Sequence, residues 1–171
     1  MKIKTCTFFG HRNTSLSVDL QDKLYDLIED LIINQNVYNF VFGSKSNFDT
    51  FCHNIVSKLK DKYSFINRIS YPCYHERVFL EEEKEKFQKY FTHIVNPNMK
   101  ILTVDKIVNF KVLEKTGKTS YLQRNKLMID DSDICIFYYA EGSEDVAKNS
   151  GTKMAYDYAK KQKKFIINLY K

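Results

Sequence analysis

Short apolar runs alternate with amphipathic segments along most of the chain. Runs rich in β-branched and aromatic residues predict strands at 3–9, 38–42, 64–71, 99–104, 133–139 and 164–169. Between them, apolar residues recur at helical spacing, as from Leu20 to Leu31 and from Phe48 to Leu59. Strands that alternate with helices are typical of βαβ units. The pattern therefore predicts an α/β fold with a mainly parallel sheet flanked by helices.

The remaining segments are predicted with less detail. Ser17 or Asp19 can cap the first helix. A charged helix is expected from Val78 to Phe91, and another helix at 121–131. The pattern is weakest at 96–119, where 108–113 is open between a strand and a loop insertion.

The last quarter of the chain carries the strongest candidate for binding chemistry. After the strand at 133–139, Ser150, Gly151 and Thr152 open a helix that leads to the last strand. In such a unit the loop lies at the carboxyl edge of the sheet, where ligands bind. Unpaired N–H groups and the Thr152 hydroxyl can hold a phosphate there. The alternative is that Ser150 is an ordinary N-cap and Gly151 a turn residue.

The first strand ends in a similar polar turn. Gly10 lets the backbone approach a ligand closely, while His11 and Arg12 leave the strand as donors. A turn glycine followed by two solvated polar residues is the alternative interpretation.

The second strand repeats this arrangement. It ends at Gly43 and Ser44, which come next to the first turn if the two strands are neighbours. Asp49 follows in the first turn of the next helix, where it can accept hydrogen bonds from a ribose or a base edge. Equally, its carboxylate can simply offset the helix dipole.

Two further segments supply polar candidates. Arg124 and Asn125 lie on the predicted helix at 121–131, near the carboxyl edge, although pairing of Arg124 with a nearby carboxylate is an alternative. Glu76 follows the third strand and is a weak candidate for a catalytic carboxylate.

Composition narrows the class of protein. With 171 residues, of which 43% are hydrophobic, we expect one domain spanning 1–171. No apolar run is long enough to span a bilayer, so we expect a cytosolic protein without a membrane partner. The four cysteines and four histidines show no metal-ligand spacing, and neither a metal nor a cofactor is expected. The formal charge of +6 favours an anionic partner.

Together these motifs resemble the SLOG superfamily, and within it the YpsA-like proteins. The resemblance rests on the strand followed by Gly-His-Arg, on Gly43-Ser44 with Phe48-Asp49, on the segment 124–133 and on Ser-Gly-Thr at 150–152. It implies a Rossmann-like three-layer α/β/α domain that binds nucleotides or nucleotide-derived ligands. Relatives in the superfamily include the DNA-processing protein DprA and the phosphoribohydrolases called lonely guy. The matched site positions are Gly10, Arg12, Gly43, Ser44, Asp49, Arg124, Asn125, Ser150, Gly151 and Thr152.

One departure from this resemblance concerns catalysis. Lonely-guy enzymes carry a glutamate soon after the phosphate turn, whereas here Lys153, Met154 and Ala155 follow Thr152. Only Glu76, Glu141, Glu144 or Asp145 could substitute from elsewhere. Glu141, Glu144 and Asp145 would also oppose a phosphate unless they point away.

Besides a purely structural or partner-binding role, three functions remain open from the sequence. The preferred one is a module that binds a nucleotide or a nucleotide-derived small molecule, with the phosphate at 150–152. The alternatives are an N-glycosidase or phosphoribohydrolase acting on nucleotides, and a protein that binds single-stranded DNA. A homo-oligomer is left open.

Overall fold

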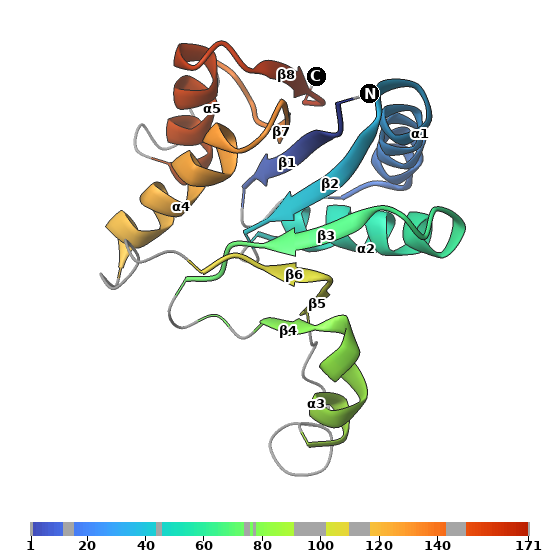
Figure 1. The fold of residues 1–171 in the computed structure, drawn as a ribbon. Helices are drawn as coiled ribbons and strands as arrows, with labels where there is room; N and C mark the ends of the chain where they lie inside the picture. Colours follow the sequence, from blue (N-terminus) through green and yellow to red (C-terminus); the bar gives the residue numbers. More distant parts are fainter. Residues whose placement is uncertain are drawn as a thin grey trace.

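The protein is built around a six-stranded parallel sheet. The computed structural model describes residues 2–11, 16–43, 46–73, 76, 78–90, 102–109, 117–142 and 150–170. The strands, in sheet order, are β6 (Lys106–Ile107), β3 (Asn67–Ser70), β2 (Val37–Phe42), β1 (Lys4–Gly10), β7 (Ile134–Tyr138) and β8 (Phe165–Asn168), and all neighbours pair in parallel (Figure 1). The predicted parallel sheet is confirmed.

Helices cover both faces of this sheet. They are α1 (Val18–Gln35), α2 (Asn47–Lys62), α4 (Lys118–Asp130) and α5 (Gly151–Lys161). Because side chains alternate along a strand, Cys6 and Phe8 of β1 enter the core under α1 and α2, whereas Phe9 enters the core under α4 and α5. The result is the expected three-layer, Rossmann-like α/β/α arrangement (Figure 1).

Serine caps fix where three of these helices begin. Ser17, Ser46 and Ser150 are the N-caps of α1, α2 and α5, and each side chain accepts a backbone N–H from the third residue along. The distances are 3.2, 3.0 and 3.1 Å respectively. Each cap satisfies one of the N–H groups that a helix leaves unpaired at its start. Ser17, rather than Asp19, is the cap of α1.

The segment after β3 differs from the prediction. Val78–Leu80 forms β4 instead of the first turn of a helix, followed by the short 3₁₀ turn η1 (Glu81–Glu83) and α3 (Lys84–Tyr90). The prediction of a helix from residue 78 is wrong because Val and Phe favour strands and the three consecutive apolar residues have no helical spacing. They pair with β5 (Leu102–Val104) in a separate two-stranded sheet.

The second half of this region also needs correction. The strand predicted at 99–104 exists at Leu102–Val104, but it belongs to the small sheet, and its first residues lie outside the described ones. The main sheet instead ends at β6, which was not predicted. Val108 and Asn109 are not in a strand, and the rest of 108–113 lies outside the described residues.

A buried arginine fastens the small sheet to the main one. The Arg68 side chain, 6% exposed, forms ion pairs with Asp105 at 3.1 Å and Glu81 at 2.9 Å. It also donates to the Ser57 hydroxyl of α2 at 3.1 Å. His53 Nε2 donates to the Thr103 carbonyl of β5 at 2.8 Å. These contacts join β3 and α2 to the segments on either side of the small sheet.

Candidate functional site

The order of the strands creates a crevice at the carboxyl edge of the main sheet. β1 and β7 are neighbours, with Gly10 opposite Tyr138 at their ends. The chain leaves β1 toward α1 on one face and leaves β7 toward α5 on the other. Such a point, where connections diverge to opposite faces, is where open α/β sheets bind ligands.

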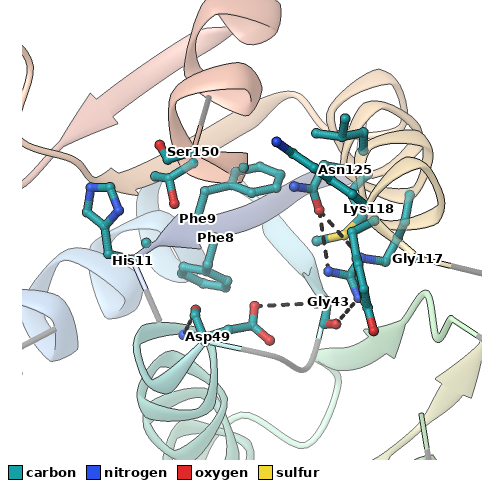
Figure 2. A pocket seen from close by; sticks show the side chains of 17 residues that line it. Phe8, Phe9, His11, Gly43, Asp49, Gly117, Lys118, Asn125 and Ser150 are labelled. Atoms are coloured by element: carbon teal, nitrogen blue, oxygen red, sulfur yellow. Dashed lines mark hydrogen bonds between the residues drawn. The ribbon is translucent and has the colours of Figure 1, made fainter. Parts of the chain in front are cut away.

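A cavity of about 520 Å³ occupies this crevice. It is lined by Phe8, Phe9, Gly10 and His11 of β1 and its end, by Gly43, Ser46 and Asp49 of the β2–α2 corner, by Gly117, Lys118, Tyr121, Leu122, Arg124, Asn125 and Met128 of α4, and by Ser150, Gly151 and Thr152 of α5. Figure 2 shows His11 and Ser150 on one side of it, Lys118 and Asn125 on the other, and Asp49 with Gly43 below. Its size is that of a small-molecule site.

The start of α5 opens into this cavity. Ser150 Oγ accepts the Lys153 N–H, and the Ser150 carbonyl accepts that of Met154 at 3.0 Å. The N–H groups of Gly151 and Thr152 have no acceptor among the described residues, as expected for the first turn of a helix. A Cβ added to Gly151 would meet nothing within 4 Å. Both residues line the cavity, so the start of this helix offers N–H donors at its wall.

Packing requires a glycine at position 10, which was not predicted from the sequence. A Cβ at this position would lie 2.6 Å from Cβ and Cγ of Phe48, which α2 buries completely against the strand. The expected role of Gly10 was close approach to a ligand. The structure gives a packing reason instead, although Gly10 still lines the cavity.

Asp49 holds the corner between β2 and α2. Its Oδ1 accepts the Gly43 N–H at 3.3 Å, while its own N–H donates to Ser46 Oγ. The side chain lies at the wall of the cavity in a residue only 4% exposed. Fixing this corner was neither of the two roles considered from the sequence.

Arg124 joins α4 to two other segments. Its Nη1 donates to the Gly43 carbonyl and to both carboxylate oxygens of Glu76, at 3.0 and 3.1 Å. The Glu76 side chain is 5% exposed and also accepts the Cys73 N–H at 2.9 Å. A Cβ at Gly43 would lie 3.0 Å from Arg124 Cζ, so glycine makes room for the guanidinium.

This ion pair changes the interpretation of both residues. The alternative in which Arg124 pairs with a carboxylate is the one observed. Glu76 is not among the described residues that line the cavity, and its carboxylate is held by Arg124. The weak catalytic candidate therefore has a structural function. Arg124 Nη2, by contrast, has among the described residues only a 3.5 Å contact to Asn125 Oδ1, and it keeps donor capacity at the cavity wall.

His11 and Asn125 face the cavity as neutral groups. Burial lowers the pKa of His11, so its imidazole is uncharged at neutral pH. Its ring lies 5.8 Å from that of Tyr139. The Asn125 Oδ1 accepts from Arg124 Nε at 3.4 Å, which turns the amide nitrogen away from the arginine. Both side chains suit hydrogen bonding more than charge neutralisation.

Two candidates, Arg12 and Ser44, lie outside the described residues, as do Glu144 and Asp145. Glu141 points along α5 rather than toward its start: it accepts from Lys160 at 2.5 Å and from the Tyr156 hydroxyl at 2.8 Å.

Among the residues described, no cluster of His, Cys, Asp and Glu could hold a metal ion. Nor is any helix in the described part of the chain long and apolar enough to cross a membrane.

One wall of the cavity was not predicted from the sequence. Lys118, Tyr121 and Leu122 precede Asn125 on one face of α4. The apolar spacing that predicted this helix already included Tyr121 and Leu122. Lys118 lies one helical turn before these residues on the same face. Extending the predicted helix by one turn would therefore have added this cation to the predicted site.

Comparison with known proteins gives a family but no activity. The chain is 32% identical over 146 residues to the uncharacterised SPbeta prophage-derived protein YoqJ of Bacillus subtilis (strain 168), covering 83% of this chain and 81% of YoqJ. The chain belongs to the family of YoqJ. No protein-family model matches it.

Solved structures agree with the fold. DNA processing protein A from Helicobacter pylori, described with a single-stranded DNA binding mode, has a TM-score of 0.53 at 19% identity. The match covers 96% of this chain and 64% of that one, so this YoqJ relative spans less than two thirds of it. The structural-genomics target TM1055 gives 0.53 at 14% identity, with 96% and 72% covered. These neighbours share the Rossmann-like fold of this chain.

Proposed function

We propose that this YoqJ-family protein binds a nucleotide or a nucleotide-derived small molecule, with a ligand phosphate at the start of α5. One observation carries the proposal: Gly151 and Thr152, whose N–H groups have no acceptor among the described residues, line a cavity of about 520 Å³ at the crevice between β1 and β7. A helix N-terminus offers both directed donors and a positive partial charge to an anion.

The other walls suit the rest of a nucleotide. Lys118 supplies an exposed cation, Asn125 an amide, and the Tyr121 ring a flat surface close to the Arg124 guanidinium, whose Cζ lies 5.2 Å from its centroid. The resemblance to the SLOG superfamily supports the same ligand class. Closer kinship with the YpsA-like proteins, a single domain over 1–171 and a cytosolic location remain predictions.

Cleavage of an N-glycosidic bond is the alternative if catalysis occurs. It needs a carboxylate beside the sugar to stabilise the transition state or activate water. Among the described residues, Asp49 is the carboxylate at the cavity wall, and its Oδ1 already accepts the Gly43 N–H. A binding function requires no such group.

Single-stranded DNA binding is the other alternative, because it is named for the Helicobacter pylori neighbour. The net charge of +6 fits any of these anionic ligands, so it does not discriminate among them.

Titration calorimetry with adenosine, AMP, inorganic phosphate and a hexathymidylate strand tests the proposal. We expect binding of AMP with adenosine weaker by about tenfold or more, since adenosine lacks the charge-assisted hydrogen bonds. If none of a wider set of mononucleotides and dinucleotides binds, the proposal is wrong. If only the strand binds, the DNA-binding alternative replaces it.

A further inference from the structure

A second groove adjoins the candidate site on the outer side of α4 and α5. It has a volume of about 290 Å³ and shares Leu122 and Asn125 with the first cavity as common walls. The two helices that form it lie side by side (Figure 1). A ligand seated at the start of α5 can therefore extend into this groove past Leu122 and Asn125.

The walls of the groove are apolar while its rim is basic. Met154 and Ala155 of α5 and the ring of Tyr158 line it, and the Tyr158 hydroxyl is fixed by Asp130 at 3.0 Å. Met154 is 38% exposed, so its side chain is accessible to a ligand in the groove. A flat heterocycle fits such a surface, because aromatic and thioether groups both pack on a base.

Two lysines at the rim supply charge. Lys126 and Lys161 are exposed, and neither forms an ion pair with any carboxylate in the described part of the chain. Lys126 Nζ lies 5.4 Å from the Tyr158 ring centroid. The carboxylate of the groove, Asp157, is already paired with Lys153 at 2.5 Å. The uncompensated charge of the rim is thus positive.

We propose that this groove, lined by Met154, Ala155 and Tyr158 and rimmed by Lys126 and Lys161, holds the second unit of a ligand made of two linked nucleotides. The proposal rests on the proposed function, since the first unit lies in the cavity with its 5′-phosphate at α5. The apolar walls take the second base, and the lysines take the phosphate that joins the units. Such a ligand is a free dinucleotide or the end of a single strand.

The test compares AMP with 5′-phosphorylated diadenylate by titration calorimetry. The wild-type protein is expected to bind the dinucleotide about tenfold more tightly, because stacking one more base typically contributes that much. Replacing both rim lysines, Lys126→Glu with Lys161→Glu, should remove this preference and leave AMP affinity within about twofold. The matched control, Lys23→Glu with Lys58→Glu, makes the same charge change on α1 and α2, across the sheet, and should keep the preference.

The outcomes separate this inference from the function on which it rests. Equal affinity for AMP and the dinucleotide in the wild type overturns the second subsite and leaves nucleotide binding intact. A preference that survives in the rim variant also overturns it. Absence of binding by AMP, by the dinucleotide and by the wider set of mononucleotides and dinucleotides overturns the proposed function itself. A 5′-phosphorylated hexaadenylate distinguishes the sources: tighter binding than the dinucleotide indicates a strand end.

Discussion

The cavity at the sheet edge and the small sheet of β4 and β5 each contain a buried arginine. In the small-sheet region, Arg68 Nε, Nη1 and Nη2 all donate within 3.2 Å, to Asp105, Ser57 and Glu81. At the cavity, Nη1 of Arg124 carries the ion pair with Glu76, while its Nη2 contact is 3.5 Å. Both arginines connect distant segments, but only one retains a donor near open space.

This difference separates a structural charge from one available to a ligand. All three nitrogens of the Arg68 guanidinium already donate hydrogen bonds to neighbouring side chains. Arg124 lies at the wall of a cavity that is also lined by Gly151 and Thr152, whose N–H groups have no acceptor among the described residues. A helix start beside an arginine at the wall of the same cavity favours the binding of an anion there.

Replacing each arginine with alanine in turn is the strongest test of this comparison. Arg124→Ala leaves Glu76 buried without its partner and should lower the free energy of unfolding by about 3–5 kcal/mol. Arg68→Ala should destabilise less, because Glu81 is 36% exposed and Asp105 keeps Lys60 at 3.5 Å. Urea denaturation measures both. The readout that distinguishes them is AMP affinity of the folded protein, which should fall in Arg124→Ala and stay unchanged in Arg68→Ala.

A double variant supplies the control for Arg124. Adding Glu76→Gln to Arg124→Ala removes the uncompensated charge and should recover part of the lost stability. If Arg124→Ala alone costs less than about 1 kcal/mol, the buried ion pair is not the connection described above.

Gly10→Ala sharpens the comparison at the cavity itself. The added methyl would come within 2.7 Å of Phe48, so we expect a loss of about 1–3 kcal/mol from overpacking. Gly151→Ala is the matched control, since its methyl meets no atom within 4 Å and should not lower stability. Thermal unfolding of the two variants should therefore differ clearly; equal melting temperatures would contradict the packing role of Gly10.

Acid should weaken the small-sheet region. Burial raises the pKa values of Asp105 and Glu81, but hydrogen bonds and neighbouring cations lower them more, so both lie below their ordinary values of 3.8 and 4.5. The stability that these carboxylates contribute is present above those ordinary values and is lost as pH falls through the lowered ones. Unfolding measured from pH 6 to pH 2.5 should show this loss.

Arg68→Met provides the comparison for that measurement. Without the guanidinium the two pKa values should return toward ordinary, so the variant should lose less stability than the wild type as pH falls. Parallel pH profiles for the two proteins would show that Arg68 is not the cause.

The smallest expected effect is chemical. An overnight incubation with nucleoside monophosphates should release no free base above the uncatalysed background, because no glutamate follows the turn at 150–152. Chromatography detects the base. Release that disappears in Glu76→Gln or Asp49→Asn would replace the binding function with a glycosidase that uses a relocated carboxylate.

Local patterns were sufficient to predict five of the six strands of the main sheet and the start of α5. Strands such as β7 are continuous apolar runs, and Ser150 precedes α5 as an N-cap, so each signal lies within a few neighbouring residues. Gly10 was predicted to lie at the site, but its packing against Phe48 depends on how α2 crosses the strand.

The features that could not be predicted from the sequence depend on contacts between distant residues. Glu76 and Arg124 are 48 positions apart and meet only because their segments converge at one corner. β4 is three residues long, too short to show a period, and is a strand because β5 lies beside it. Lys118 was missed because it stands at the first turn of α4, beyond the apolar residues that defined the helix.

The most direct test of phosphate binding at α5 is the AMP affinity of Gly151→Asp beside Gly151→Asn. Both side chains extend into open space, and both variants should fold, because an aspartate in the first turn of a helix is favourable. The asparagine is the uncharged control of nearly equal size. We expect the aspartate to weaken AMP binding at least about a hundredfold relative to the asparagine, through repulsion of the phosphate. Equal affinities in the two variants would contradict a phosphate at the start of α5.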